Sequence, residues 1–178
     1  MEPFNHALKA YNEGAVFVAF DLETTGLDPK LDCIVEIGAV KFDNKGLIAR
    51  FSALINPGIP MPEEAGKVNN ISDEMLRGKP SLEQVLPDFL RFIRGTVLTA
   101  HNTAFDCAFI RCQTPLLANP IADTLVYARE RFPGMGSYSL QNLALDLGIP
   151  AREAHRAEDD ARLCMEILLR CLETGGSE

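Results

Sequence analysis

Two carboxylates, Asp21 and Glu23, directly follow an apolar run at residues 15–19. This run is typical of a buried β-strand, in which side chains two positions apart point to the same face. We therefore expect both carboxylates to lie side by side, where ionising both is costly unless a cation lies between them. Acid-x-acid pairs are common by chance among 25 acidic residues, so the spacing alone is weak evidence. Their position at the end of a buried strand favours a site for a hard metal ion, which prefers oxygen ligands.

Two later segments bring further acids to the ends of predicted elements. Asp106 ends the segment 101–106, which follows a second apolar run at 96–100. Asp160 lies in the first turn of the last predicted helix, five residues after His155. Each has an ordinary explanation, because the helix dipole favours acids in a first turn and a lone histidine is usually a polar loop residue. Four acids and a histidine in this order, each at the end of a strand or helix, are much less expected by chance.

These motifs resemble the DEDDh group of 3′→5′ exonucleases. This DnaQ-like family includes the proofreading epsilon subunits of bacterial DNA polymerase III and the exonuclease domains of C-type replicative polymerases. The first motif is matched by DLETTGL at 21–27, the second by HNTAFD at 101–106, and the third by His155 with Asp160 five residues later. The resemblance covers nearly the whole chain, from about residue 16 to 172. A sister group carries a tyrosine four residues before the last aspartate, where this chain has an arginine, so the resemblance indicates the histidine version.

The resemblance implies two Mg²⁺ (or Mn²⁺) ions as cofactors, held by the four acids. Asp21 would contact both ions, and Glu23 and Asp160 would complete the coordination of the ion near the attacking water. Asp106 would hold the second ion, partly through water. His155 would be the general base, because an imidazole with a pKa near neutrality can take a proton from water. The implied reaction is hydrolysis of the last phosphodiester at a 3′ end, which releases a nucleoside 5′-monophosphate.

The same resemblance implies contacts to the substrate around this centre. Leu27 and Phe105 would wedge or stack against the last bases, with core packing as the alternative for both. In relatives a glutamate and, five residues on, a histidine contact the end nucleotide; here Glu64 and Asn69 occupy these positions. Asn70 follows in place of a glycine, and asparagine tolerates a left-handed backbone. The implied substrate-binding residues are Thr24 and Thr25 (through hydroxyl or backbone donors to the terminal sugar), Leu27, Glu64, Asn69, Asn102 and Phe105.

The composition is that of an ordinary globular domain. The 178 residues are 47% hydrophobic, and no apolar stretch approaches the roughly 20 residues of a membrane span. The N-terminus lacks the pattern of a signal peptide, so we expect a cytoplasmic protein without membrane contact. The five cysteines are odd in number and contain no C-x-x-C pair, which argues against a disulfide set or a zinc site. Cys164 and Cys171 are expected to pack as small apolar residues.

The pattern of apolar and turn residues predicts an α/β domain with five strands. Strands are expected at 15–21, 33–42, 46–55, 96–101 and near 119–122, with a hairpin turn at 43–46. Helices are expected at 81–95, from about 104 to 114, and at 123–132, 139–147 and 157–173. This order fits the ribonuclease-H-like fold that the resemblance implies, a five-stranded mixed sheet flanked by helices. We expect an N-terminal arm at 1–14 (a short helix or a loose segment), the exonuclease domain at 15–173 and a tail at 174–178.

Three functions are compatible with these motifs. The first is digestion of single-stranded or frayed DNA from its 3′ end, in replication proofreading or repair, with a replicative polymerase subunit as a partner. The second is trimming of RNA, because RNA offers the same phosphate and 3′ hydroxyl. The third is a non-catalytic module that docks on a polymerase. Degenerate modules usually lose their metal ligands, and none of the four acids is missing here, so the sequence favours an enzyme.

The net charge of −8, with no run of lysine or arginine, favours an enzyme that grips only the last few nucleotides of a strand. The logarithm of the affinity for single strands should fall with the logarithm of salt at roughly −0.7 per phosphate contacted, so we predict a slope of about −2 to −3. Binding in Ca²⁺, taken as a metal that supports binding but little cleavage, measures this slope. Tight, strongly salt-dependent binding to blunt or circular duplex would instead indicate recognition by an extended surface.

Overall fold

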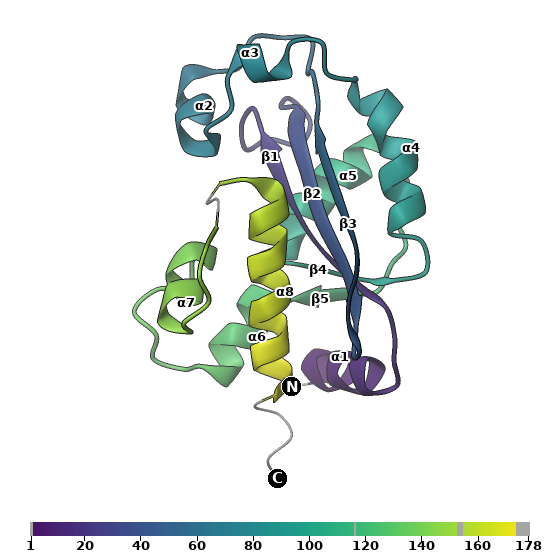
Figure 1. The fold of residues 1–178 in the computed structure, drawn as a ribbon, viewed down its shortest axis with the longest axis vertical. Helices are drawn as coiled ribbons and strands as arrows, with labels where there is room; N and C mark the ends of the chain where they lie inside the picture. The colour runs from purple at the N-terminus through teal and green to yellow at the C-terminus, as the bar shows by residue number, and fades with distance from the viewer. Residues whose placement is uncertain (1, 116, 153–154, 174–178) are drawn as a thin grey trace.

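The chain folds around a single five-stranded mixed sheet (Figure 1). The computed structural model describes residues 2–115, 117–152 and 155–173. The strand order is β3-β2-β1-β4-β5; β1, β2 and β3 pair antiparallel, and β4 and β5 run parallel to β1. This topology confirms the predicted ribonuclease-H-like fold. The strands are β1 (Phe17–Thr24), β2 (Ile34–Asp43), β3 (Gly46–Leu54), β4 (Val97–Ala100) and β5 (Ile121–Asp123).

Helices cover both faces of the sheet. Alternate residues of β1 pack into two different cores: Phe17 and Ala19 face α8, and Val18 and Phe20 face α4 and α5. The predicted helices are all present, with boundaries shifted by a few residues. The helices are α1 (Glu2–Asn12), α2 (Glu63–Asn69), α3 (Asp73–Leu76), α4 (Leu82–Phe92), α5 (Thr103–Gln113), α6 (Thr124–Arg131), α7 (Leu140–Asp146) and α8 (Ala157–Glu173).

The N-terminal segment is a packed helix, so the alternative of a loose arm is wrong for residues 2–12. Phe4 is 4% exposed and meets Tyr127 of α6 edge to face, with the ring centroids 5.2 Å apart. The Tyr127 hydroxyl also donates to the Pro3 carbonyl over 3.1 Å. The predicted tail at 174–178 lies outside the described residues. Across the described chain, none of the helices combines the length and apolar character needed to cross a membrane.

Two short helices between β3 and α4 were not predicted. Figure 1 shows α2 to the left of the end of β1 and α3 above it. The first, α2, begins after Pro62 without a side-chain cap and ends at Asn69, and the residue that caps it, Asn70, has a φ of 55°. Asn70 thus adopts the left-handed backbone that the sequence suggested for it. Cys164 and Cys171 lie on the buried face of α8 and pack into the core, as predicted.

Helix α8 touches β2 closely at one glycine. A Cβ built on Gly38 would lie 2.0 Å from the Ala157 carbonyl carbon and 2.0 Å from the Glu158 nitrogen. Gly38 is also the Cα partner of Asp21 on β1. The absence of a side chain at Gly38 therefore allows the first turn of α8 to lie directly over the carboxylates of β1.

Gly38→Ala should lower the free energy of unfolding by about 1–3 kcal/mol or more. The added methyl group would overlap the backbone of α8, which cannot rotate away as a side chain could. Urea denaturation measures the change. Gly136→Ala is the matched control, since a Cβ at Gly136 meets no atom within 4 Å and its φ is not positive. The control should stay within about 0.5 kcal/mol of the wild type. Equal stability of the two variants would contradict the close approach of α8.

Candidate active site

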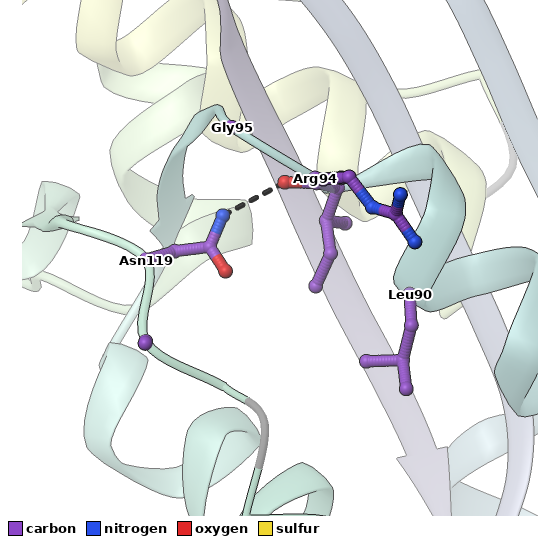
Figure 2. A pocket seen from close by; sticks show the side chains of 6 residues that line it. Leu90, Arg94, Gly95 and Asn119 are labelled. Carbon is purple, nitrogen blue, oxygen red and sulfur yellow. Dashed lines mark hydrogen bonds between the residues drawn. The ribbon is translucent and has the colours of Figure 1, made fainter.

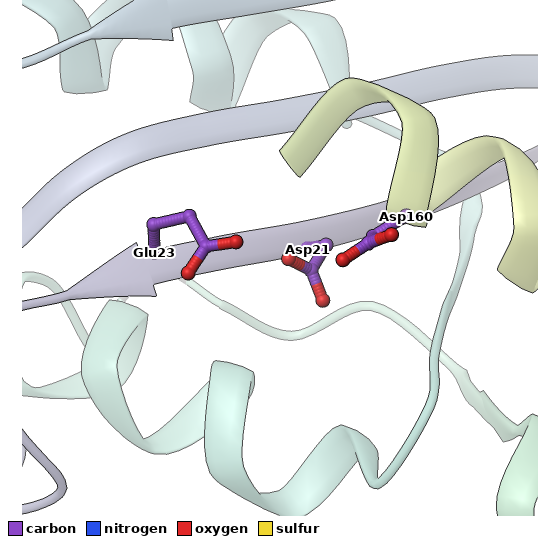
Figure 3. Close-up of side chains that lie close together, drawn as sticks. All are labelled: Asp21, Glu23 and Asp160. Carbon is purple, nitrogen blue, oxygen red and sulfur yellow. The ribbon is translucent and has the colours of Figure 1, made fainter. Parts of the chain in front are cut away.

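Three of the four predicted acids meet at the carboxyl end of β1. Asp21 and Glu23 project from β1, and Asp160 projects from the first turn of α8 toward the same space (Figure 3). One ligand oxygen from each of the three lies within 4.8 Å of the others. Asp106 of α5 is outside this group, but its Oδ1 accepts a hydrogen bond from the Leu22 N–H over 3.2 Å. The structure thus brings the acids together from three separate elements.

Burial disfavours the ionised form of every one of these acids, and nearby carboxylates add to it. Burial raises the pKa of Asp21 well above its usual value, and the neighbouring carboxylates raise it further. Burial, Asp160 and Glu36 raise the pKa of Glu23 to about 8. Burial likewise raises the pKa of Asp106 to about 8 and that of Asp160 to about 6. Such a cluster calls for a cation, because a hard divalent ion would stabilise the charged carboxylates.

The carboxylate of Asp160 is oriented by a neighbouring helix. Gln141 of α7 donates from Nε2 to Asp160 Oδ1 over 2.5 Å, and this hydrogen bond partly offsets the rise in the pKa of Asp160. This contact could not be predicted from the sequence, since Gln141 lies 19 residues from Asp160 and only folding brings α7 and α8 together.

His155 lies just before α8 and lines a cavity at the carboxylate cluster. This cavity has a volume of about 440 Å³ and is lined by both β1 acids, Asp160, His101 and His155. The His155 side chain is exposed, and its backbone has a φ of 59°. Positive φ is uncommon for residues other than glycine, so a strained turn presents the imidazole to the cavity.

His101 is placed as a neutral brace. Its Nε2 lies 2.7 Å from the Tyr138 carbonyl and its Nδ1 lies 3.0 Å from the Thr124 hydroxyl. A carbonyl only accepts, so Nε2 carries the hydrogen. Burial lowers the pKa of His101, which keeps the ring neutral. His101 thereby ties the loop before α7 to the end of β4.

Asp123, at the end of β5, fixes the start of the helix that carries Asp106. Its carboxylate accepts from the N–H of Thr103 over 2.9 Å and from the N–H of Leu125 over 2.9 Å. These donors belong to the first turns of α5 and α6, and a carboxylate there satisfies N–H groups that the helices leave unpaired. One side chain therefore joins two helix N-termini and sets the direction of α5.

A second cavity lies at the opposite end of the sheet, between the end of α4 and residues 118–119 (Figure 2). Its volume is about 320 Å³. Asn119 donates from Nδ2 to the carbonyl groups of Ile93 over 2.7 Å and Thr96 over 2.9 Å. The described residues of its lining include Arg94 but neither a carboxylate nor a histidine, so they offer no acid–base pair.

Comparison with known proteins agrees with this geometry. Residues 18–168 match the family described as Exonuclease (RNase_T). The chain is 50% identical over 165 residues to the DNA polymerase III subunit epsilon of Treponema pallidum, which covers 89% of this chain and 77% of that protein. The chain belongs to the exonuclease family. It is a 3′→5′ exonuclease of the DnaQ type, and therefore a hydrolase of phosphodiester bonds.

Other proteins similar to this exonuclease include a larger polymerase and two exonucleases of known structure. The exonuclease is 40% identical over 161 residues to the PolC-type DNA polymerase III of Caldanaerobacter subterraneus, and the match spans 88% of this chain but only 12% of that protein. The solved structure of exonuclease X in complex with 5′ overhanging duplex DNA has a TM-score of 0.75 at 27% identity, covering 91% of this chain and 94% of that chain. Exonuclease I from E. coli with a dT13 oligonucleotide has a TM-score of 0.74 at 19% identity, over 89% of this chain and 40% of that chain, which shows the shared fold.

The predicted substrate residues of the exonuclease fall into two groups. Leu27 is 82% exposed, so core packing is wrong for this side chain. Glu64 on α2 and Asn102 before α5 are also exposed, and Asn102 has a φ of 74°. Phe105 is half-buried and packs on Phe109 with the ring centroids 5.1 Å apart, which leaves part of the ring open.

The remaining predicted contacts are engaged within the protein. The Thr24 hydroxyl donates to the Gly26 carbonyl over 2.6 Å. The Thr25 hydroxyl donates to Asp32 over 3.2 Å, and the Thr25 N–H donates to the Cys33 carbonyl over 2.9 Å. These donors brace the loop after β1 and are not available to a sugar in this arrangement. Asn69 is buried, and its Nδ2 donates to the Thr24 carbonyl over 2.8 Å.

Without metal, the exonuclease should lose stability as the pH rises from about 5.5 to 8.5. The pKa values of Asp160 (about 6) and of Glu23 and Asp106 (about 8) are raised by folding, so the folded state binds more protons in this window. Stability is then greatest while these groups are protonated and is lost through their folded pKa values. We expect a loss of at least about 1.4 kcal/mol, the equivalent of one pKa unit, in denaturation with EDTA.

Asp21→Asn provides the control for this pH dependence, because it removes one of the repelling charges at nearly constant shape. The stability of this variant should depend less on pH than that of the wild type. In the wild-type protein, added Mn²⁺ should raise the free energy of unfolding more at pH 8 than at pH 6. Wild-type stability that is flat or rises between these pH values in EDTA would contradict the clustering of the carboxylates.

Proposed function

We propose that this exonuclease removes nucleotides one at a time from the 3′ end of single-stranded or frayed DNA, in replication proofreading. The observation that carries the proposal is the meeting of Asp21, Glu23 and Asp160 beside an exposed histidine in one open cavity. The likeness to an epsilon subunit supports proofreading and a polymerase as the partner, in the cytoplasm. RNA trimming is the alternative, since the same centre can hydrolyse either backbone.

The carboxylates of this site suit divalent metal ions, which prefer oxygen ligands. Asp21, Glu23 and Asp160 would hold one ion, because their ligand oxygens lie within 4.8 Å of one another and carboxylates suit Mg²⁺ or Mn²⁺. Asp106 would serve a second Mg²⁺, in keeping with its place outside that group and beside Asp21. When bound, the ions supply positive charge at the scissile phosphate and so favour attack by water.

The side chains of this centre divide the remaining work. The imidazole of His155 takes the proton from the attacking water at a ring nitrogen, which requires the neutral ring. Gln141 keeps the Asp160 carboxylate turned toward β1, and the Leu22 N–H does the same for Asp106. The strained backbone at His155 holds the base in place before substrate arrives.

Exposed apolar groups near the centre would bind the end of the strand. Leu27 and the open part of Phe105 offer surfaces for the last bases, and stacking contributes roughly 1–3 kcal/mol per base without regard to sequence. Glu64 and Asn102 are exposed and would contact the end nucleotide. Thr24, Thr25 and Asn69 would act by fixing the loop after β1, because their donors are used there.

A side-by-side digestion tests this function. Matched single-stranded DNA, mispaired duplex DNA, paired duplex DNA and RNA are each labelled at the 5′ end and incubated with Mg²⁺ or with excess EDTA. We expect a ladder shortened from the 3′ end, faster on mispaired than on paired ends because unpaired bases are already released from the stack. Faster digestion of RNA than of DNA would favour the trimming function, and full activity in EDTA would contradict the metal assignment.

Two substitutions separate ligand from base. Asp21→Ala should abolish turnover, because it removes the acid placed between all the others. His155→Ala should bind Mn²⁺ like the wild type but lower kcat about 10²–10⁴-fold, the usual contribution of a general base. Manganese titration and single-strand digestion give the two readouts. Near wild-type turnover by His155→Ala would make this histidine a loop residue and exclude the mechanism.

A further inference from the structure

A fifth carboxylate lies beside the catalytic cluster, and the mechanism above does not use it. Glu36 of β2 is 1% exposed and is the Cα partner of Glu23 on β1. Its negative charge contributes to the raised pKa of Glu23. Replacing a buried ion pair with apolar groups often leaves stability unchanged or raises it. Stability alone therefore does not explain a buried glutamate at this position.

Within the described part of the chain, the hydrogen bonds of the Glu36 carboxylate go to the two residues that follow His155. Arg156 donates to Glu36 Oε1 from Nη2 over 2.8 Å, and its Nε lies 3.3 Å from both carboxylate oxygens. The backbone N–H of Ala157 donates to Oε2 over 3.3 Å. Glu36 therefore grips both a side chain and a backbone group within two residues of the base.

The turn at His155 needs such an anchor. Its φ of 59° is uncommon for a residue other than glycine, and such a conformation persists only where its surroundings fix it. On the helix side, Ala157 is pressed against Gly38 and bonded to Glu36. Asp160 lies a turn further into α8, where its N–H donates to the Arg156 carbonyl over 3.0 Å. Its carboxylate has a further support in Gln141, which Glu36 does not supply, whereas the anchor at Glu36 holds the two residues directly after His155.

We propose that Glu36, through its pairing with Arg156 and Ala157, is a positioning residue that holds His155 in its working place over the carboxylate cluster. This inference rests on the proposed role of His155 as general base. Glu36 itself touches no reacting atom. Its loss should move the base while the β1 ligands Asp21 and Glu23 stay in place.

The variant Glu36→Gln tests this role in a double-mutant cycle with His155→Ala. Alone, Glu36→Gln should lower kcat on single-stranded DNA about 10–100-fold, because displacement of a catalytic group by about 1 Å costs about that much. KM should change less than about threefold, and the affinity for Mn²⁺ should not fall in step with kcat. In the His155→Ala background, the same substitution should change kcat less than about threefold, since the group that it positions is already absent.

Variants of Arg156, the partner of Glu36, and a control at the neighbouring Glu158 complete the experiment. Arg156→Ala should reproduce the loss in kcat, and Arg156→Lys should recover part of it; these variants carry the test if Glu36→Gln does not fold. Glu158→Gln is the matched control, because it breaks the half-exposed pair between Arg50 and Glu158, joined over 2.9 Å, in the same turn of α8. It should retain wild-type kcat.

The outcomes distinguish this inference from the proposed function. Full activity of Glu36→Gln, or losses that multiply independently in the double mutant, would overturn the positioning role and leave His155 as the base. Weakened Mn²⁺ binding in step with kcat would also overturn it, because Glu36 would then act on the metal site. Near wild-type activity of His155→Ala would overturn both.

Discussion

Four carboxylates are held together at the end of β1 against their mutual repulsion, and much of the domain is built around that constraint. Burial and neighbouring charge raise the pKa of each one. A protein that only had to fold would avoid such a cluster, since separated and solvated acids cost far less. The repulsion is therefore the physical link between the fold and the chemistry, because a divalent cation relieves it and a phosphodiester can share that cation.

Two helices reach the cluster from different directions, and each depends on a device at its N-terminus. Gly38 and Glu36 of β2 fix the start of α8, one by leaving room and the other by hydrogen bonds. Asp123 fixes the start of α5 by accepting from the first-turn N–H groups of two helices. The sheet thus serves as a rigid base on which these starts are set, and the carboxylates follow within about one helical turn of each.

Much of the fold could be predicted because its signals are local. The apolar run before Asp21, the hairpin turn at 43–46 and the capped helix at 82–92 each follow from neighbouring residues. Helix α1 also carried a signal, since Phe4, Ala7 and Tyr11 share the helical face that packs into the core. The short helices α2 and α3 were missed because tertiary contacts outweigh propensity in segments of seven and four residues.

The supporting groups of the site were beyond reach from sequence. Gln141, Glu36 and Asp123 act on partners 19, 120 and 20 residues away, and no spacing rule connects them. The two threonines at the end of β1, Thr24 and Thr25, show the converse difficulty. The motif match placed them beside the acids of β1. Their hydrogen-bond partners could not be predicted, because these depend on how the following loop folds back to Asp32.

Anomalous diffraction from crystals of the active enzyme soaked in Mn²⁺ and a nucleoside 5′-monophosphate tests the central claim most directly. Manganese peaks should lie between Asp21, Glu23 and Asp160, with the phosphate on the open side of the cavity and His155 facing it. Absence of manganese from this cluster, in crystals of protein that digests DNA in the same Mn²⁺ buffer, would contradict the account.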